Sequence, residues 1–149
     1  MTNKEAVSID ETGPDLITAR LSVQESPEVW WEADPMVRVR ADFPLSAEKG
    51  STSTAVVYFE LEPGCKLGRH TDSAEEVLLV LQGNAEITVG TKSGQVSAGE
   101  LVVVPEMVPH SIHNVGDTTV KVVGFFPRGH IVSEFDQPYE PMGQRIFEF

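Results

Sequence analysis

The stretch Glu76–Val89, EVLLVLQGNAEITV, indicates the fold of this chain. Its two halves, Glu76–Gln82 and Ala85–Val89, are rich in apolar and β-branched residues, which favour extended strands. Between them lies Gly83-Asn84, a dipeptide of the kind found in hairpin turns. The sequence therefore predicts two short strands joined by a hairpin-type turn.

Similar short strands are predicted on both sides of this stretch. Residues Val37–Asp42 alternate apolar and charged side chains, which is typical of a strand with one buried face. No long segment has the 3.6-residue period of a helix, and glycines separate the apolar runs at close spacing. This pattern predicts an all-β sandwich or barrel. The other predicted strands are Ala55–Leu61, Gln95–Ser97, Leu101–Val104, Ser111–Asn114 and Thr119–Phe126.

The segment before the first predicted strand contains a helix-start signal. Residues Ser26–Glu28 combine a capping hydroxyl, a proline and an acid, so they predict a short helical turn that ends before Asp34-Pro35. Trp30 and Trp31 in this turn either anchor the segment on a sheet or a partner subunit, or form a platform for a ligand. The expected organisation is an N-terminal arm and docking segment at 1–36, a barrel at 37–126, and a C-terminal tail at 127–149 that packs on the barrel.

Length and charge narrow the classes of function. The 149 residues suffice for one domain, and a net charge of −12 would repel nucleic acid and anionic membranes. A single cysteine, Cys65, excludes an internal disulfide framework, and no apolar run is long enough to span a bilayer. We therefore expect a cytoplasmic protein with no nucleic-acid and no membrane partner, which acts on a small-molecule substrate or ligand.

The residues that lead into the opening stretch include a group of candidate metal ligands. His70, Asp72 and Glu76 share the same parity, so in an extended chain they project to one side, together with the apolar Leu78. Burying an imidazole and two carboxylates is costly unless something compensates their charge, and a divalent cation is the usual compensation.

A second window downstream supplies another histidine. A predicted buried strand runs into a turn bounded by Pro105 and Pro109, and His110 follows directly. His113 has the opposite parity and is expected to face away from His110. A His-x-Asp pair plus a distant His is the composition of the facial triad that holds non-haem Fe(II), and Glu76 is a candidate fourth ligand.

These two windows resemble the two motifs of the cupin family. The first reads Gly64-x5-His70-x-Asp72-x3-Glu76-x6-Gly83, and the second reads Gly99-x5-Pro105-x-Met107-x2-His110-x3-Asn114. Two positions depart from the family pattern, because Asp72 replaces a histidine and Met107 replaces a turn glycine. The resemblance implies a cupin-type antiparallel β-barrel, or jelly roll, that forms a homodimer. It also implies a divalent metal ion held by His70, Glu76 and His110, with Asp72 in the remaining ligand position.

The function that this resemblance favours is a metal-dependent enzyme acting on a small organic molecule, of the non-haem Fe(II) dioxygenase type. Asp72 and Glu76 are the expected catalytic residues. If Glu76 also ligates the metal, then Mn, Ni, Co or Zn and isomerase or lyase chemistry become comparable alternatives. Another alternative is a non-catalytic cupin that binds or senses a small ligand, and in a barrel without metal His70 and Asp72 would pair by a hydrogen bond.

Specificity is expected to depend on residues around the barrel interior. The candidates for the substrate pocket are Phe59, Met107 and Phe125. Arg38 and Arg40 share one face of their predicted strand, where they either line a mouth that attracts an anionic substrate or form outward salt bridges.

Overall fold

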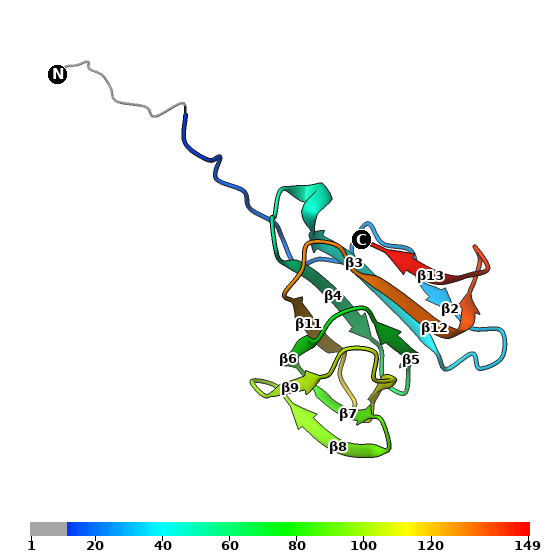
Figure 1. Ribbon diagram of the computed structural model, residues 1–149. Helices are drawn as coiled ribbons and strands as arrows, with labels where there is room; N and C mark the ends of the chain where they lie inside the picture. The colour runs from blue at the N-terminus through cyan, green and yellow to red at the C-terminus, as the bar shows by residue number, and fades with distance from the viewer. Residues whose placement is uncertain (1–11) are drawn as a thin grey trace.

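Two six-stranded sheets, whose strands pair antiparallel, form the body of the protein (Figure 1). The computed structural model describes residues 12–149. The first sheet has the order β13-β12-β5-β10-β7-β8. Its strands are β5 (Lys66–Asp72), β7 (Asn84–Val89), β8 (Lys92–Ser97), β10 (His110–Asn114), β12 (Val132–Tyr139) and β13 (Gln144–Glu148).

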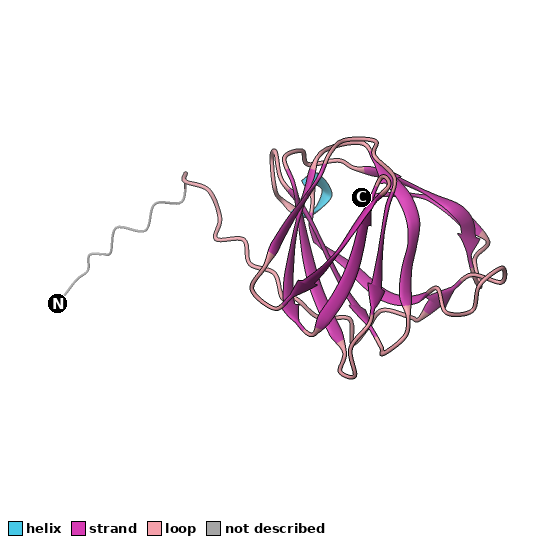
Figure 2. Cartoon of the chain, turned by 90° about the horizontal axis from the view of Figure 1, so that it is seen from below, coloured by secondary structure: helices cyan, strands magenta, loops and turns pink. Residues whose placement is uncertain are grey.

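The second sheet has the order β2-β3-β4-β11-β6-β9. Its strands are β2 (Val29–Trp30), β3 (Arg38–Leu45), β4 (Ala55–Leu61), β6 (Glu76–Gln82), β9 (Leu101–Val104) and β11 (Val120–Phe126). A short 3-10 turn, η1 (Ala47–Lys49), follows β3. The sheets curve around a common interior, as Figure 2 shows from below, and this is the all-β barrel that the sequence predicted.

The main core lies between the two sheets and follows the alternation of β6, β7 and β10. Leu78 and Val80 on β6 point inward with Ile87 on β7 and Ile112 on β10, and each is at most 4% exposed. Their neighbours along each strand are half-buried or exposed. One apolar face of each of these three strands therefore contributes to the interior.

The turn at Gly83-Asn84 has a different role from the one predicted. The strands on either side of it, β6 and β7, lie in different sheets, because β6 pairs with β11 and β9 whereas β7 pairs with β10 and β8. Gly83 has φ of 89°, and a Cβ there would lie 2.9 Å from Cγ2 of Val120. Glycine thus allows the chain to cross tightly from one sheet to the other, and the hairpin prediction was wrong.

The predicted N-terminal helix is not present either. Val29 and Trp30 form β2, which pairs with Val39 and Arg38 of β3. Trp31 is buried against Gly68, where a Cβ would lie 2.2 Å from Cζ2 of the indole. One helical turn gains little from local propensity, so sheet pairing and burial of Trp31 outweigh the cap signal. Trp31 anchors the segment on the sheet of its own chain. This agrees with the first of the two roles considered for the tryptophans, anchoring, rather than with a ligand platform.

The segment after Pro127 forms the last two strands of the first sheet. β12 lies between β13 and β5, so Val132–Tyr139 lies directly beside the strand that carries His70 and Asp72. Within residues 12–149 no helix has the length and apolar character needed to cross a membrane.

Candidate metal centre

Strand register brings the two predicted histidine ligands together. His70 on β5 and His110 on β10 are direct cross-strand partners, and their ring centroids lie 4.1 Å apart. A β-bulge after His110 shifts the register before Ile112. Both imidazoles are almost fully buried, so the pair faces the barrel interior.

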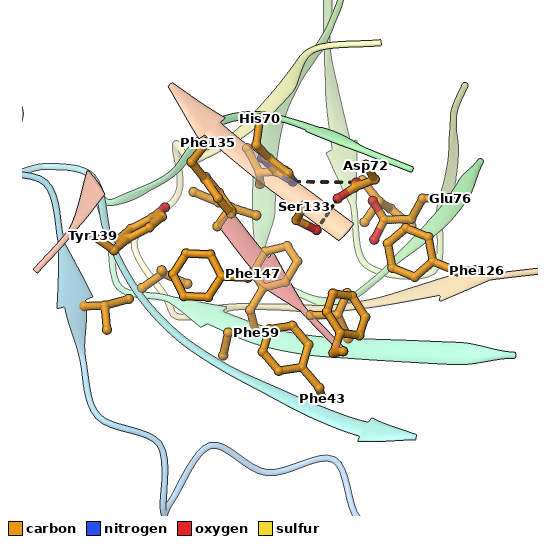
Figure 3. A pocket seen from close by; sticks show the side chains of 18 of the residues that line it. Phe43, Phe59, His70, Asp72, Glu76, Phe126, Ser133, Phe135, Tyr139 and Phe147 are labelled. Atoms are coloured by element: carbon orange, nitrogen blue, oxygen red, sulfur yellow. Dashed lines mark hydrogen bonds and ion pairs between the residues drawn. The ribbon is translucent and has the colours of Figure 1, made fainter. Parts of the chain in front are cut away.

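Asp72 completes a compact group with these histidines. Its Oδ2 atom lies 3.1 Å from Nε2 of His110 and 3.7 Å from Nε2 of His70. Each of the three residues offers a ligand atom within 4.8 Å of the other two. Figure 3 shows His70 and Asp72 on the wall of the pocket, with Glu76 beside them.

Glu76 approaches the group from the opposite sheet. Its Oε1 atom lies 3.5 Å from Nε2 of His110, and its side chain is 3% exposed. Gly124 on the neighbouring strand β11 makes room for this carboxylate, because a Cβ at that position would lie 2.1 Å from Oε2 of Glu76. Glu76 therefore lies next to His110 but outside the group of three.

Backbone carbonyls orient both imidazoles. Nδ1 of His70 lies 2.7 Å from the carbonyl oxygen of Gly68, and Nδ1 of His110 lies 3.0 Å from that of Val108. A carbonyl can only accept a hydrogen bond, so each Nδ1 carries a proton and donates it. In the neutral tautomer each Nε2 then presents a lone pair, which is the arrangement of metal-bound histidines.

Ser133 holds the carboxylate in a similar way. It is the cross-strand partner of Asp72 on β12, and its hydroxyl donates a 2.5 Å hydrogen bond to Oδ1 of Asp72. This leaves Oδ2 directed at the histidines. Ser133 was not predicted from the sequence, because nothing in the pattern after Pro127 indicated a strand.

Burial and charge shift the pKa values of the four titratable groups. Burial, and then the neighbouring His110, lower the pKa of His70 to about 4. Burial alone would also lower the pKa of His110, but the carboxylates of Asp72 and Glu76 outweigh it and raise that pKa to about 10. Burial raises the pKa of Glu76 to about 7, with a further contribution from Asp72. Burial opposes ionisation of Asp72 too, yet the adjacent histidines and the Ser133 hydroxyl keep its pKa below the usual value.

The group fits a divalent cation. Within the described chain, neither Oδ2 of Asp72 nor Nε2 of His110 has a hydrogen-bond partner, although both atoms are buried and lie 3.1 Å apart. Buried polar atoms are rarely left without partners. Two imidazoles and one carboxylate, each oriented by an outer hydrogen bond, are the donors of a facial-triad metal site. His70, Asp72 and His110 are therefore the residues that can hold the metal.

A cavity of about 210 Å³ opens directly beside this centre. Phe59, one of the predicted pocket residues, lines it together with His70, Asp72 and Glu76.

The other two residues predicted for the substrate pocket, Phe125 and Met107, do not line this cavity. Phe125 points to the outer face of the sheet and is 41% exposed, whereas its neighbour Phe126 lines the cavity. Met107 lies in the turn after β9, is 56% exposed and does not reach the cavity. Phe125 has the strand parity of the polar Thr119 and Lys121. Phe126 has that of Val120 and Val122, so the alternation along this strand distinguishes the outer from the inner phenylalanine.

Comparisons with known proteins agree with this fold. A family model described as a cupin domain matches residues 57–126. An uncharacterised protein of Streptomyces coelicolor is 33% identical over 94 residues, which cover 56% of this chain and 90% of that protein.

Two solved structures illustrate the likeness. A Bacillus subtilis oxalate decarboxylase with Mn(II) centres matches with a TM-score of 0.60 at 21% identity, over 66% of this chain and 28% of that one. A mutant salicylate 1,2-dioxygenase from Pseudoaminobacter salicylatoxidans, in complex with gentisate, matches with a TM-score of 0.52 at 17% identity. That match covers 60% of this chain and 25% of the dioxygenase. At sequence identities of 21% and 17%, the similarity to these two structures shows a shared fold.

Proposed function

Because this chain belongs to the cupin superfamily, we propose that it is a metal-dependent enzyme acting on a small organic molecule, of the non-haem Fe(II) dioxygenase type. The observation that carries the proposal is the group of His70, Asp72 and His110, which contains two imidazoles and one carboxylate at the wall of a cavity. When bound to such a set, Fe(II) supplies open coordination positions at which O2 and a substrate can be activated together.

The chain's own residues would prepare this site. The carbonyls of Gly68 and Val108 fix the two imidazoles, and Ser133 fixes Asp72. These outer contacts hold the donor atoms in place before a metal arrives, so little reorganisation accompanies its binding.

Glu76 is the proposed proton-transfer residue. Its carboxyl lines the cavity, and its pKa of about 7 lets it both accept and release a proton near neutral pH. Asp72 has a lowered pKa and a direct place among the donor atoms, so it stays ionised and serves as a ligand.

A second candidate function follows from the position of Glu76. Its carboxylate lies 3.5 Å from Nε2 of His110, so a small side-chain movement would add it to the ligand set. A site with a fourth protein ligand would suit Mn, Ni, Co or Zn and a Lewis-acid isomerase or lyase reaction. The Mn(II) centres of the similar oxalate decarboxylase agree with this alternative.

Oxygen uptake after anaerobic loading with Fe(II) tests the proposal. We expect uptake with at least one compound from a panel of diketones, flavonols, thiols and substituted benzenes, and loss of that uptake in Asp72→Ala. The matched control is Glu75→Ala, which removes an exposed carboxylate three residues from Asp72 and should leave uptake unchanged. No uptake across the panel by iron-loaded protein would contradict the dioxygenase assignment.

A further inference from the structure

The cavity beside the metal centre is built mainly from aromatic rings. Six of the seven phenylalanines of the chain line it. Five of them come from strands of both sheets, and the sixth follows β13 directly. Figure 3 shows the five strand phenylalanines on several sides of the space. The six are Phe43, Phe59, Phe126, Phe135, Phe147 and Phe149.

These rings also contact one another and the metal centre. Phe43 and Phe149 stack with centroids 4.1 Å apart, and Phe135 stacks on the imidazole of His70 at 4.3 Å. The aromatic wall therefore reaches the edge of the metal centre and would guide a flat, apolar molecule toward it.

The ionisable side chains of the cavity wall, apart from Tyr139, are His70, Asp72 and Glu76. No Lys or Arg of the described chain is among the lining residues. Arg38 makes a 2.8 Å salt bridge with Glu28, and Arg40 donates a hydrogen bond to the carbonyl of Ser26. These contacts do not support the possibility, raised by the sequence, that the two arginines attract an anionic substrate.

The two hydroxyl groups in the cavity wall already take part in hydrogen bonds. The Ser133 hydroxyl donates to Asp72, and the Tyr139 hydroxyl accepts a hydrogen bond from the backbone N–H of Gly68. Asp72, and Glu76 when ionised, offset the charge of a bound divalent cation. A small dianion such as oxalate would therefore meet little net positive charge, and an apolar wall would desolvate it.

Size limits the ligand further. A dry apolar cavity of about 150 Å³ can bind benzene, so about 210 Å³ accommodates one ring with a few substituents. Among the lining residues, Pro27 and Met142 are the exposed ones and mark the mouth.

We propose, resting on the function proposed above, that the substrate is a neutral molecule built on a single aromatic ring or an apolar group of similar size. The ring packs among the phenylalanines, and its polar substituents point to His70, Asp72 and Glu76. The cavity thereby selects against small carboxylate dianions.

The test compares nitrobenzene with benzoate, which has nearly the same shape but carries a charge. Binding is measured on EDTA-treated, metal-free protein by NMR titration of methyl signals. Nitrobenzene is expected to bind about tenfold or more tightly than benzoate, because Asp72 in the wall repels a second carboxylate and no lysine or arginine lines the cavity to offset its charge. Contacts between nitrobenzene protons and the methyl groups of Leu78 and Ile112 should locate it inside the barrel.

A matched pair of variants checks the location. Ala41 lines the cavity from β3, so Ala41→Phe fills the space and should weaken nitrobenzene binding about tenfold. The adjacent Arg40 is exposed and does not line this cavity, so Arg40→Phe should leave binding unchanged. If Ala41→Phe fails to fold, the contacts to Leu78 and Ile112 in the unaltered protein decide the location.

Two results would overturn the inference: benzoate binding as tightly as nitrobenzene to metal-free protein, or nitrobenzene contacts lying outside the cavity. If the proposed dioxygenase function is wrong but the ligand class is right, the experiments give a different result. In that case the protein binds no Fe(II), but nitrobenzene still occupies the cavity, and the apolar ligand class stands.

Discussion

The hydroxyl of Ser133 donates a 2.5 Å hydrogen bond to Oδ1 of Asp72 across the pair of strands β12 and β5. Asp72 thus has one oxygen fixed by the sheet and the other, Oδ2, facing His70 and His110. Since Asp72 is shorter than the histidine it replaces in the cupin motif, this hydrogen bond is the contact that holds the carboxylate among the donor atoms.

Replacing Ser133 by alanine should weaken metal binding without unfolding the protein. Loss of an outer-shell partner typically lowers metal affinity about 10–100-fold. Calorimetric titration with Zn²⁺ measures this change, and Ser133→Thr should recover most of the affinity because it restores a hydroxyl. Ser111→Ala is the matched control, since Ser111 lies next to His110 on β10 but is only half-buried. Equal affinities of Ser133→Ala and the unaltered protein would show that the hydrogen bond does not support the site.

Gly124 is expected to be required for the position of Glu76. In Gly124→Ala the new Cβ would lie 2.1 Å from Oε2 of Glu76 and 2.9 Å from Cγ1 of Val57. Such overpacking typically costs about 1–3 kcal/mol, which urea denaturation can measure.

Two further variants control this experiment. Gly94→Ala in β8 should have little effect, because a Cβ there meets no atom within 4 Å. Adding Glu76→Ala to Gly124→Ala should recover part of the lost stability, since it removes the closer of the two clashes. Strictly additive losses in the double variant would mean that Glu76 does not occupy the space beside Gly124.

Metal affinity should rise with pH between about 6.5 and 8.5. In the metal-free protein the pKa of His110 is about 10, so its imidazole carries a proton that a metal must displace. The pKa of His70 is about 4, so that ligand is already neutral in this range and adds no pH dependence. The apparent Zn²⁺ affinity is therefore expected to increase by about tenfold per pH unit, with release of about one proton.

Calorimetry in buffers of different ionisation enthalpy measures the released proton directly. Below neutral pH the slope should steepen if Glu76 joins the ligand set, because its pKa is about 7 and it must also ionise. An affinity that stays constant across the range would contradict a protonated His110.

The same carboxylates and histidines also indicate how far the sequence determines the site. The shared parity of His70, Asp72 and Glu76 predicted that all three face inward, and all three are buried in the barrel wall. The resemblance to the cupin motifs added His110, which the register of β5 and β10 places opposite His70. Local spacing was sufficient for His70, Asp72 and Glu76 because burial alternates along β5 around the first two and along β6 from the third.

Residues that depend on distant pairing could not be predicted. Ser133 and Phe135 reach the site only because β12 pairs with β5, and the segment that forms β12 shows no clear alternation. The turn at Gly83 looks like a hairpin locally, but the choice between two sheets depends on contacts far along the chain. The helix-start signal before Trp30 also predicted the wrong conformation. Pairing of Val29 and Trp30 with β3 stabilises an extended strand there instead.

The metal content of protein purified without an affinity tag tests the central claim most directly. We expect about one divalent metal ion per chain in the unaltered protein and in Glu75→Ala, and a loss of most of that metal in Asp72→Ala, with melting temperatures showing that each variant is folded. Iron as the main metal would support the dioxygenase assignment, and manganese, nickel, cobalt or zinc would favour the isomerase or lyase alternative. Equal metal content in Asp72→Ala and the unaltered protein, or no metal in a folded sample after loading, would contradict a metal centre formed by His70, Asp72 and His110.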